Sequence, residues 1–489
     1  MSGADHEIEL KFACAPQDLA AVLAAAPAGD DETRELISVY FDTPDLALRK
    51  AGASLRVREH KGRRVQTLKR GQGLVREEHE AAIEGLAPDP TLAPLPSLLP
   101  HGATLKPAFH VRVSRRQRTL RYRGARIELA LDQGELAGGD RLSPICEVEL
   151  ELKSGPTSAL FALARALSLA VPLYLTFDSK AARGHALVAG DSPAARKGER
   201  IALASEATAG EALQAVARAA LAQIAANAAA VRAEAGAEAV HQLRVGARRL
   251  RSALTTFKPL LDGDPGVGPV KAELKWLSHT LDRARNLDVF ADETLAAAEE
   301  AKAPPPGLGA LRATVEAARL AAWTQAAETA GGERFRALMI DTAAWIETGA
   351  WRNGGRASEP AKAFARHALK RRLKRLETRG RRLERDDAAR HRLRIEAKKL
   401  RYAAEAFASR FGQRRAGRFG RRLEALQETL GRLNDLVTAE PLLASLSLAP
   451  DAAFAAGELV GLKAAGKDRL VAKAAHDLER LLAADPFWD

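Results

Sequence analysis

Two different periodicities of apolar and polar residues divide the chain. Up to about residue 190, apolar and charged residues alternate, as in 7–11, 55–58, 126–132 and 147–152. Alternation places every second side chain on one face of a β-sheet, so these segments are predicted strands with one apolar and one charged face. Beyond about residue 205, Ala- and Leu-rich segments recur with a helical period and are interrupted by Gly- and Pro-rich stretches at 263–268, 303–307 and 352–355. The pattern predicts a strand-rich half followed by an all-α half.

The element pattern also predicts where the domains meet. Helices are expected at 16–26 and 156–170 within the strand-rich half, and the segment DSPAARKGE at 191–199 is typical of a linker. A chain of 489 residues is too long for one ordinary domain. We therefore predict an α+β protein of two domains, at 1–190 and 201–489, joined by a linker at 191–200. The second domain is expected to contain two repeats, at about 205–340 and 341–489.

Composition places this chain among soluble proteins. Its N-terminus is acidic where a signal peptide would be basic and then apolar, and no apolar run is long enough to span a bilayer. The two cysteines, Cys14 and Cys146, have no metal-type spacing, which argues against both a disulfide framework and a zinc-thiolate site. We expect a cytoplasmic protein that does not contact membranes.

The net charge of +13 is unevenly distributed. Residues 362–422 contain 23 Lys and Arg against 6 Asp and Glu, a local excess of 17 positive charges, so the remainder of the chain is near −4. Such an excess predicts a polyanionic partner: nucleic acid, an acidic membrane surface or polyphosphate.

The charged faces of the predicted strands carry separate acidic and basic sets. If the strands close into a barrel with these faces inward, the interior is a polar tunnel. Neighbouring carboxylates repel one another unless a divalent cation lies among them, and their hard oxygen atoms suit Mg²⁺ or Mn²⁺. Lysine and arginine side chains could then bind phosphate oxygens. Acids for a metal together with bases for phosphate are what phosphoryl transfer requires.

These strands resemble the CYTH domains, or triphosphate tunnel metalloenzymes. The segment EIELKF at 7–12 is similar to the ExExK signature of that family, and further motifs follow in order at 40–58, 67–70, 76–80, 127–135, 144–155 and 179–184. The resemblance covers the first 190 residues. It implies an eight-stranded antiparallel β-tunnel with flanking helices, which binds triphosphate and Mg²⁺ or Mn²⁺.

The same resemblance implies roles for individual residues. The metal ligands would be Glu7, Glu9, Asp132, Glu147, Glu149 and Glu151. The phosphates would be bound by Lys11, Arg56, Arg58, Lys69, Arg115, Lys180 and Arg183. The catalytic set would be Glu7, Glu9, Lys11, Asp132 and Glu149.

The helical half contains an internal repeat. HQLRVGARRLRSALTTF begins at His241 and HRLRIEAKKLRYAAEAF begins at His391, 150 residues later. On a helix, each segment has a buried-type apolar stripe and a basic stripe on a roughly opposite face. A further basic helix follows Arg366. The basic stripes give the candidate polyphosphate-binding residues: His241, Arg244, Arg248 and Arg251; His367, Arg371 and Lys374; His391, Arg394, Lys398 and Arg401.

Basic residues at every helical turn repel one another unless an anion neutralises them. A phosphate chain offers one negative charge per unit and no base to read, and histidine adds a donor that titrates near neutral pH. Nucleic acid is the rival ligand, but no aromatic residues interleave the basic stripes to stack on bases. We therefore expect inorganic polyphosphate rather than nucleic acid.

The repeats are similar to the CHAD domain, named for its histidine-bearing helices, from about residue 201 to the C-terminus. The resemblance implies two pseudo-symmetric helical bundles whose basic helices bind inorganic polyphosphate, and a location on polyphosphate granules. The domain order resembles that of bacterial inorganic triphosphatases.

The sequence thus predicts a metal-dependent inorganic triphosphatase joined to a polyphosphate-binding module. Two alternatives remain: a non-catalytic, granule-associated binding protein and a class IV-type adenylate cyclase, which shares the tunnel motifs. No adenine-reading element is evident for the cyclase. The pattern leaves the phosphate chain length, the metal and the oligomeric state open.

Overall fold

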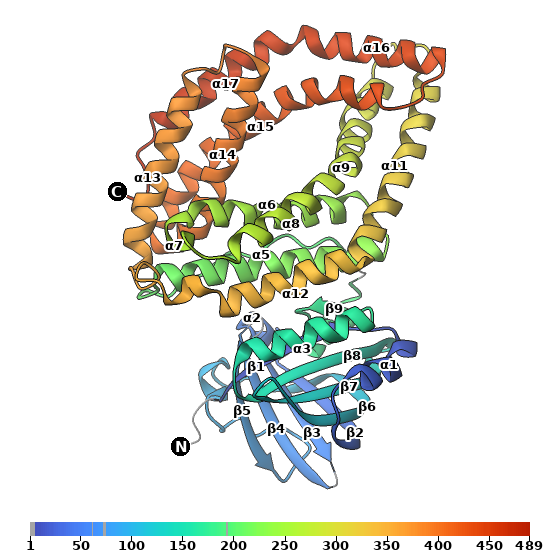
Figure 1. Cartoon of the computed structure of the whole chain (residues 1–489), viewed down its shortest axis with the longest axis vertical. Coiled ribbons are helices and arrows are strands. Elements are labelled where there is room, and N and C mark those ends of the chain that lie inside the picture. Colours follow the sequence, from blue (N-terminus) through green and yellow to red (C-terminus); the bar gives the residue numbers. More distant parts are fainter. Residues whose placement is uncertain (1–4, 61, 72–74, 192–193) are drawn as a thin grey trace. The chain divides into compact units, whose positions relative to one another are not determined.

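The computed structural model describes residues 5–60, 62–71, 75–191 and 194–489, with the side chains of residues 5–7, 75 and 76 outside the description. The chain forms two compact units, one of Met1–Ala194 with Ala330–Thr348, and one of Ala195–Thr329 with Gly349–Asp489. Figure 1 shows a strand-rich unit and an all-helical unit. Among the described residues, no helix is both long and apolar enough to cross a bilayer.

Eight long antiparallel strands close into a barrel in the first unit. Around the ring the order is β1, β5, β4, β3, β2, β6, β7 and β8, and closure follows because β1 pairs with both β5 and β8. A short strand, β9 (Tyr174–Thr176), adds to β1. The strands are β1 (Asp5–Ala13), β2 (Gly29–Asp42), β3 (Ala53–His60), β4 (Arg63–Arg70), β5 (Val75–Ile83), β6 (Lys106–Tyr122), β7 (Ala125–Gly138) and β8 (Arg141–Ser154). The predicted eight-stranded antiparallel tunnel is confirmed.

The apolar core of this unit lies largely outside the barrel wall. On β3, the buried Leu55 and Val57 alternate with Arg56 and Arg58, so the two sets point to opposite sides of the wall. The apolar set packs with Leu48 of α2 (Ala47–Lys50) and Leu95 of η2 (Leu95–Ser97). This arrangement leaves the charged set inside the barrel.

One end of the barrel interior is filled by apolar side chains beneath α4 (Lys180–Ala189). Leu36, Val111, Val113, Leu136 and Ile145 form a buried cluster with Ala181 of this helix. Side chains at every second position of a strand point to the same face. These apolar residues share the inward-facing row of their strands with the polar residues of the cavity, so the cluster forms the floor of the polar cavity. The apolar cluster therefore occupies the part of the barrel interior next to α4.

Gly184 allows α4 to lie against this floor. A Cβ atom at position 184 would meet the ring of Phe109 at 2.2–2.5 Å. Phe109 is itself held by stacking on Tyr40, with ring centroids 4.6 Å apart. Because the rigid ring cannot move aside, any larger residue at 184 must shift α4.

We expect Gly184→Ala to reduce the free energy of unfolding by about 1–3 kcal/mol, the usual cost of overpacking a core. We also expect it to reduce activity, because α4 carries Lys180 into the site described below. The matched control is Gly190→Ala, at the exposed end of α4, where the glycine has a φ of 75° and a Cβ would meet only the end of the flexible Arg141 side chain, at 2.5–2.9 Å. If Gly184→Ala leaves both the melting temperature and turnover unchanged, the close packing of α4 is not required.

The helix α12 (Glu333–Thr348) comes from the C-terminal half of the sequence but packs within the first unit, against α3 (Thr157–Ala170). The Tyr174 hydroxyl donates to the Gly331 carbonyl at 3.2 Å, and Arg336 lies over the Tyr174 ring at 5.8 Å. Arg165 and Asp341 approach to 3.5 Å. The strand-rich unit thus includes a helix that periodicity alone assigned to the helical half.

The second unit repeats a three-part helical motif. The helices α5, α6 and the consecutive pair α8–α9 recur about 150 residues later as α13, α14 and α15, at the same spacing as the sequence repeat. Their bounds are α5 (Ala209–Arg232), α6 (Ala237–Thr256), α8 (Val267–Thr280), α9 (Asp282–Val289), α13 (Ala361–Gly380), α14 (Asp387–Phe407) and α15 (Gln413–Ala444). The remaining longer helices are α11 (Leu308–Gly331), α16 (Pro450–Ala465) and α17 (Lys467–Leu482).

Local sequence explains where the repeated helices begin. Thr208 and Glu211 form a capping box at α5: the Glu211 amide donates to the Thr208 hydroxyl, and the Thr208 amide donates to the Glu211 carboxylate. Asp386 caps α14 by accepting from the Ala389 amide at 2.6 Å. In Figure 1 the helices of this unit are arranged in a ring.

Candidate active site in the tunnel and candidate anion site on the helices

Strand register brings the acidic and basic sets together on the inner wall. Glu9 of β1 lies opposite Glu151 of β8, and Lys11 lies opposite Glu149. On the other side of β8, Asp132 of β7 lies opposite Glu147 and pairs in turn with Arg115 of β6. Residues that are far apart in the sequence therefore form one continuous charged surface.

The facing wall is mainly basic. Arg56 and Arg58 of β3 pair with Tyr40 and Ser38 of β2. Lys69 of β4 lies opposite Glu78 of β5, with Nζ to Oε2 at 3.2 Å.

The two walls enclose a polar cavity of about 230 Å³. Its charged lining residues are Glu9, Lys11, Arg56, Arg58, Lys69, Glu78, Glu80, Arg115, Glu128, Glu149, Glu151, Lys153 and Lys180, with Tyr40, Ser54, Ala130, Ser179 and Ala181 completing the lining.

Lys180 lies among three buried carboxylates. Its Nζ atom is 2.7 Å from Asp132, 2.7 Å from Glu147 and 2.9 Å from Glu149. Ser179 positions it by capping α4, where its side chain accepts from the Ala182 amide at 3.0 Å. The ammonium group thus neutralises a group of acids that would otherwise repel one another.

Arginine and lysine side chains complete this ion cluster. Arg115 donates to both oxygens of Asp132, at 2.6 and 2.7 Å, and also to Glu149. Lys11 is 2.7 Å from Glu149, and Arg183 donates to Glu147. Each of the three carboxylates therefore has at least two cationic partners.

These pairs keep the buried groups charged. Burial by itself raises the pKa of Asp132 and of Glu149, but the neighbouring cations outweigh it and lower both values, that of Glu149 strongly. Burial lowers the pKa of Lys180, but the three carboxylates raise it well above its usual value. Asp132, Glu149 and Lys180 are thus charged across the physiological pH range.

Among the cations of the cavity whose pKa is shifted, Arg58 is the one that carboxylates neutralise least. Burial, together with the charges of Arg56 and Arg115, lowers its pKa to about 9. Its Nε donates to the Ser38 hydroxyl at 3.0 Å. An anion placed in the cavity would offset this repulsion, so the site favours a negatively charged ligand.

Asp132, Glu147 and Glu149 form an acidic cluster with the donors a divalent metal requires, since one oxygen of each lies within 4.8 Å of the others. However, the Lys180 ammonium lies at that position, and a divalent ion there would have to displace it. Glu149 also faces the cavity, as do Glu9 and Glu151. Carboxylate oxygens of this kind at the cavity wall are the ligands that Mg²⁺ or Mn²⁺ prefers, although Glu149 is also paired with Lys11 and Lys180.

Most of the residues predicted from the sequence line the cavity or its ion cluster. Among the exceptions, Glu7 lies on β1 but its side chain is outside the described part of the structure. Arg183 joins the ion cluster through Glu147 and also donates to the Pro144 carbonyl, but it does not line the cavity itself. Tyr40, Ser54, Lys153 and Ser179 line the cavity and were not predicted. For Tyr40, the alternation that places Arg56 inward on the paired strand could have indicated it.

In the helical unit, α6 and α14 contact each other and bury their apolar stripes. Leu243 and Leu250 of α6 and Leu393 and Leu400 of α14 are fully buried, which confirms the predicted core faces. The packing brings parts of the two basic stripes together. We call Arg244, Arg248, Arg394 and Lys398 the α6/α14 basic cluster.

Mutual repulsion is strong within the α6/α14 basic cluster. Burial, followed by the charges of Arg248, Arg394 and Arg244, lowers the pKa of Lys398 to about 6. Burial also lowers the pKa of Arg394, and Asp435 only partly compensates. Acidic side chains therefore neutralise the positive charge of this cluster only in part.

Some members of the predicted stripes have protein partners instead. Arg244 is held by Asp282 at 2.6 Å and by the Leu281 carbonyl at 2.9 Å. Arg401 pairs with Glu405 at 2.8 Å, and His391 contacts Asn434 at 3.1 Å. Arg251 donates to Ser278 at 3.4 Å.

The histidine of the first repeat lies next to an arginine that was not predicted. Burial and then the charge of Arg285 lower the pKa of His241 to about 4, so it is neutral near pH 7. Arg285 belongs to the segment 281–290, whose resemblance to 430–436 could have indicated it.

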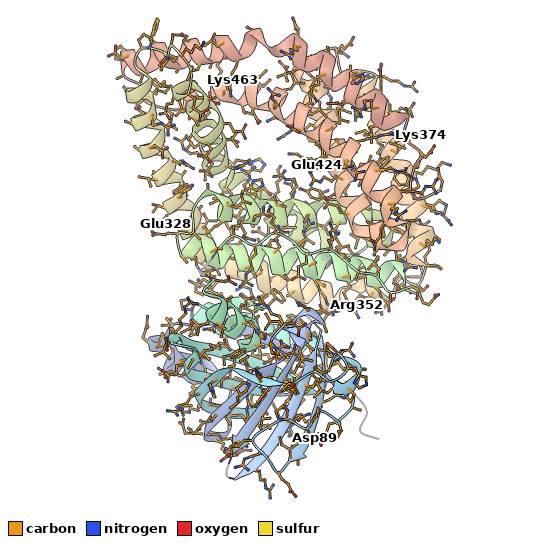
Figure 2. All side chains as sticks on the ribbon, turned by 180° about the vertical axis from the view of Figure 1, so that it is seen from behind. Asp89, Glu328, Arg352, Lys374, Glu424 and Lys463 are labelled. Carbon is orange, nitrogen blue, oxygen red and sulfur yellow. The ribbon has the colours of Figure 1, made fainter. Side chains whose placement is uncertain are left out.

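The basic residues predicted on α13 lie on its exposed surface. His367, Arg371 and Lys374 are exposed, and Figure 2 shows Lys374 at the edge of the helical unit. Burial and the charges of Arg375 and Arg356 lower the pKa of Arg371. Among the described residues, no pKa shift arises from an interaction between this stripe and the α6/α14 basic cluster.

Comparisons with known proteins cover both units. The CYTH domain model matches residues 5–185, and the CHAD domain model matches residues 215–444. A curated inorganic triphosphatase from Haemophilus influenzae is 33% identical over 193 residues, which is 37% of this chain and 55% of that protein. The chain thus matches about half the length of this curated relative.

Two solved structures are similar to more than half of this chain. The crystal structure of the CHAD domain from the plant Ricinus communis is 31% identical and has a TM-score of 0.53, covering 60% of this chain and 98% of that one. PptA from Streptomyces chartreusis is 23% identical with a TM-score of 0.42, covering 56% of this chain and 98% of that one.

Proposed function

Because the chain belongs to the CYTH family in residues 5–185 and to the CHAD family in residues 215–444, we propose that it hydrolyses inorganic triphosphate in the tunnel and binds inorganic polyphosphate on the helical unit. The observation that supports hydrolysis is the meeting of acidic and basic walls in one polar cavity. The triphosphatase activity of the Haemophilus influenzae relative supports the same reaction.

Within the tunnel we assign phosphate binding to the cations that face the cavity. Lys11, Arg56, Arg58, Lys69, Arg115 and Lys180 line it from both walls. Arg183 supports this set indirectly, because it holds Glu147. A linear triphosphate carries its charges along its length, so cations on both walls can bind each phosphoryl group in turn.

The carboxylates divide into two roles in this proposal. Asp132 and Glu147 are almost fully buried and orient Lys180 and Arg115. Glu9, Glu149 and Glu151, with Glu7 on the same strand as Glu9, would hold Mg²⁺ or Mn²⁺. Such an ion would neutralise charge on the phosphoryl oxygens during attack by water.

The activity is tested by measuring phosphate release from triphosphate, long polyphosphate and ATP, with Mg²⁺ and with Mn²⁺. We expect metal-dependent release, fastest from triphosphate. Binding without release would favour the non-catalytic, granule-associated alternative. Pyrophosphate release from ATP with formation of cyclic AMP would favour the cyclase.

On the helical unit, the polyphosphate proposal rests on the α6/α14 basic cluster. Two repeats each contribute cations to one place, and burial there makes like-charge repulsion costly. A phosphate chain would remove that cost. Binding of this kind would place the protein on cytoplasmic polyphosphate granules.

We expect polyphosphate affinity to fall as pH rises above about 6. In the free protein the pKa of Lys398 is about 6, so the amine is charged below that pH and neutral above it. A bound polyanion favours the charged amine, so binding above pH 6 takes up a proton. Affinity should then fall by up to about tenfold per pH unit until the pKa of the complex is reached. Titrations with long-chain polyphosphate at constant ionic strength from pH 5.5 to 8 measure this slope.

Lys398→Met is the variant that isolates this amine. It should bind more weakly at pH 5.5 and show a flatter profile, because the titrating group is gone. His241 has a pKa of about 4 in the free protein, so any contribution it makes to the slope depends on the polyanion raising that pKa and persists in Lys398→Met. An unchanged slope in Lys398→Met would assign the pH dependence to another group.

A further inference from the structure

A separate arginine-lined hollow lies between α15 and α17 in the helical unit. It has a volume of about 420 Å³ and is lined by Arg418, Arg421 and Arg422 of α15, by Asp477 and Arg480 of α17, and by Ala425. None of these residues belongs to the α6/α14 basic cluster or to the stripes predicted from the sequence.

Helical spacing explains why the arginines converge. Arg418, Arg421, Arg422 and Ala425 follow the i, i+3, i+4, i+7 pattern that places side chains on one face of α15. The small side chain of Ala425 leaves the centre of the hollow open. Phe419, which is buried and packs edge-on against Trp488 at 5.0 Å, fixes this part of α15 in place.

The arginines of the hollow lack protein counter-ions. Within the described part of the chain, Arg418, Arg421, Arg422 and Arg480 form no ion pair and no side-chain hydrogen bond. Elsewhere on α15, Glu424 points to a different neighbour, Arg401 of α14, at 3.6 Å. Acids are thus available on this helix but are not placed in the hollow.

The one acid in the hollow is already neutralised. Asp477 is 5% exposed, and its Oδ2 accepts from Lys473 and from the Thr429 hydroxyl, both at 2.7 Å. Burial alone raises the pKa of Asp477, but these two partners lower it overall, so the carboxylate stays charged. It therefore belongs to the helix contact and leaves four guanidinium groups to face a ligand.

Guanidinium groups bind phosphate oxygens in pairs, and four of them around one hollow require several negative charges within a small space. A condensed phosphate meets this requirement, since its neighbouring phosphate groups share a bridging oxygen. The hollow has no aromatic lining residue to stack on a base. We propose that this hollow is a second anion site, which binds the adjacent phosphate groups of a condensed inorganic phosphate independently of the α6/α14 basic cluster.

Residue-resolved arginine modification tests the site in the full-length protein. Exposed arginines are modified with phenylglyoxal, and the rate at each position is read by mass spectrometry with and without inorganic pyrophosphate at matched ionic strength. At ten times Kd, about one tenth of the sites are free, so the four arginines should react about tenfold more slowly. Arg379 and Arg382, which are exposed and do not line the hollow, are internal controls and should react as before.

Two variants make the outcome specific. In Arg421→Gln/Arg422→Gln, pyrophosphate should no longer protect Arg418 and Arg480. In Arg394→Gln/Lys398→Gln, which disables the α6/α14 basic cluster, protection of the hollow should persist. The proposal is overturned if pyrophosphate slows Arg379 and Arg382 equally, if only long polyphosphate protects the hollow, or if protection is lost with the α6/α14 variant. The tunnel does not affect this readout, because protection is measured at the arginines themselves.

Discussion

Replacing Glu149 with glutamine is expected to reduce triphosphate hydrolysis by about 10²- to 10³-fold, the usual effect of removing one electrostatic element from an active site. Glu149 is the carboxylate that both faces the cavity and joins the ion cluster, since it is 2.7 Å from Lys11 and 2.9 Å from Lys180. Glutamine has the same shape but no charge, so it weakens a metal site and leaves these cations without their shared partner. Initial rates with Mg²⁺ and with Mn²⁺ measure the effect.

The matched control is Glu135→Gln on β7. Glu135 is exposed and does not line the cavity, so this change should leave turnover near that of the unmodified protein. Circular dichroism and melting temperature separate a lost reaction from a lost fold, because unpairing buried cations also destabilises the barrel. Nearly unchanged turnover in a folded Glu149→Gln protein would contradict the proposed role of this carboxylate.

Reversing the charges of Arg394 and Lys398 to glutamate is expected to weaken polyphosphate binding by about 100-fold. Each charged contact contributes about 1.5 kcal/mol or more, so losing two costs about 3 kcal/mol. The new carboxylates would lie beside Arg248 and Arg244, which favours a folded protein. Binding isotherms over a range of salt concentrations should also show a smaller salt dependence, because fewer counter-ions are released.

The comparison variant reverses Arg371 and Lys374 on the exposed side of α13. These residues were predicted from the same kind of stripe, and at pH 5.5, where Lys398 is charged, the change in charge is equal, but we expect a smaller loss of affinity. Triphosphate hydrolysis should be unaffected in both variants. If the α13 variant loses more affinity than the α6/α14 variant, the principal binding surface lies on α13. If single-stranded nucleic acid binds as tightly as polyphosphate at equal phosphate concentration, nucleic acid becomes the preferred ligand.

The sequence was sufficient for the architecture and for the repeat. Alternation over short segments distinguishes strands from helices because side-chain direction is a local property of the backbone. The same alternation separated Leu55 and Val57 from Arg56 and Arg58, and the barrel places them on opposite sides of its wall. The 150-residue repeat likewise reappears as matching helices, with Leu243 and Leu393 buried in each.

The tertiary structure determines which charged side chains contact one another. Lys180 lies 48 positions after Asp132 in the sequence, and nothing local indicates that α4 closes the barrel and brings this ammonium among three carboxylates. Helical period placed His367, Arg371 and Lys374 on one face of α13, but only packing shows that this face is exposed. The same holds for α12, which joins the strand-rich unit. Periodicity determines the direction of a side chain relative to its own element. The partners of that side chain depend on closure of the barrel and on docking between elements that are distant in the sequence. The charges along a segment do not encode these contacts.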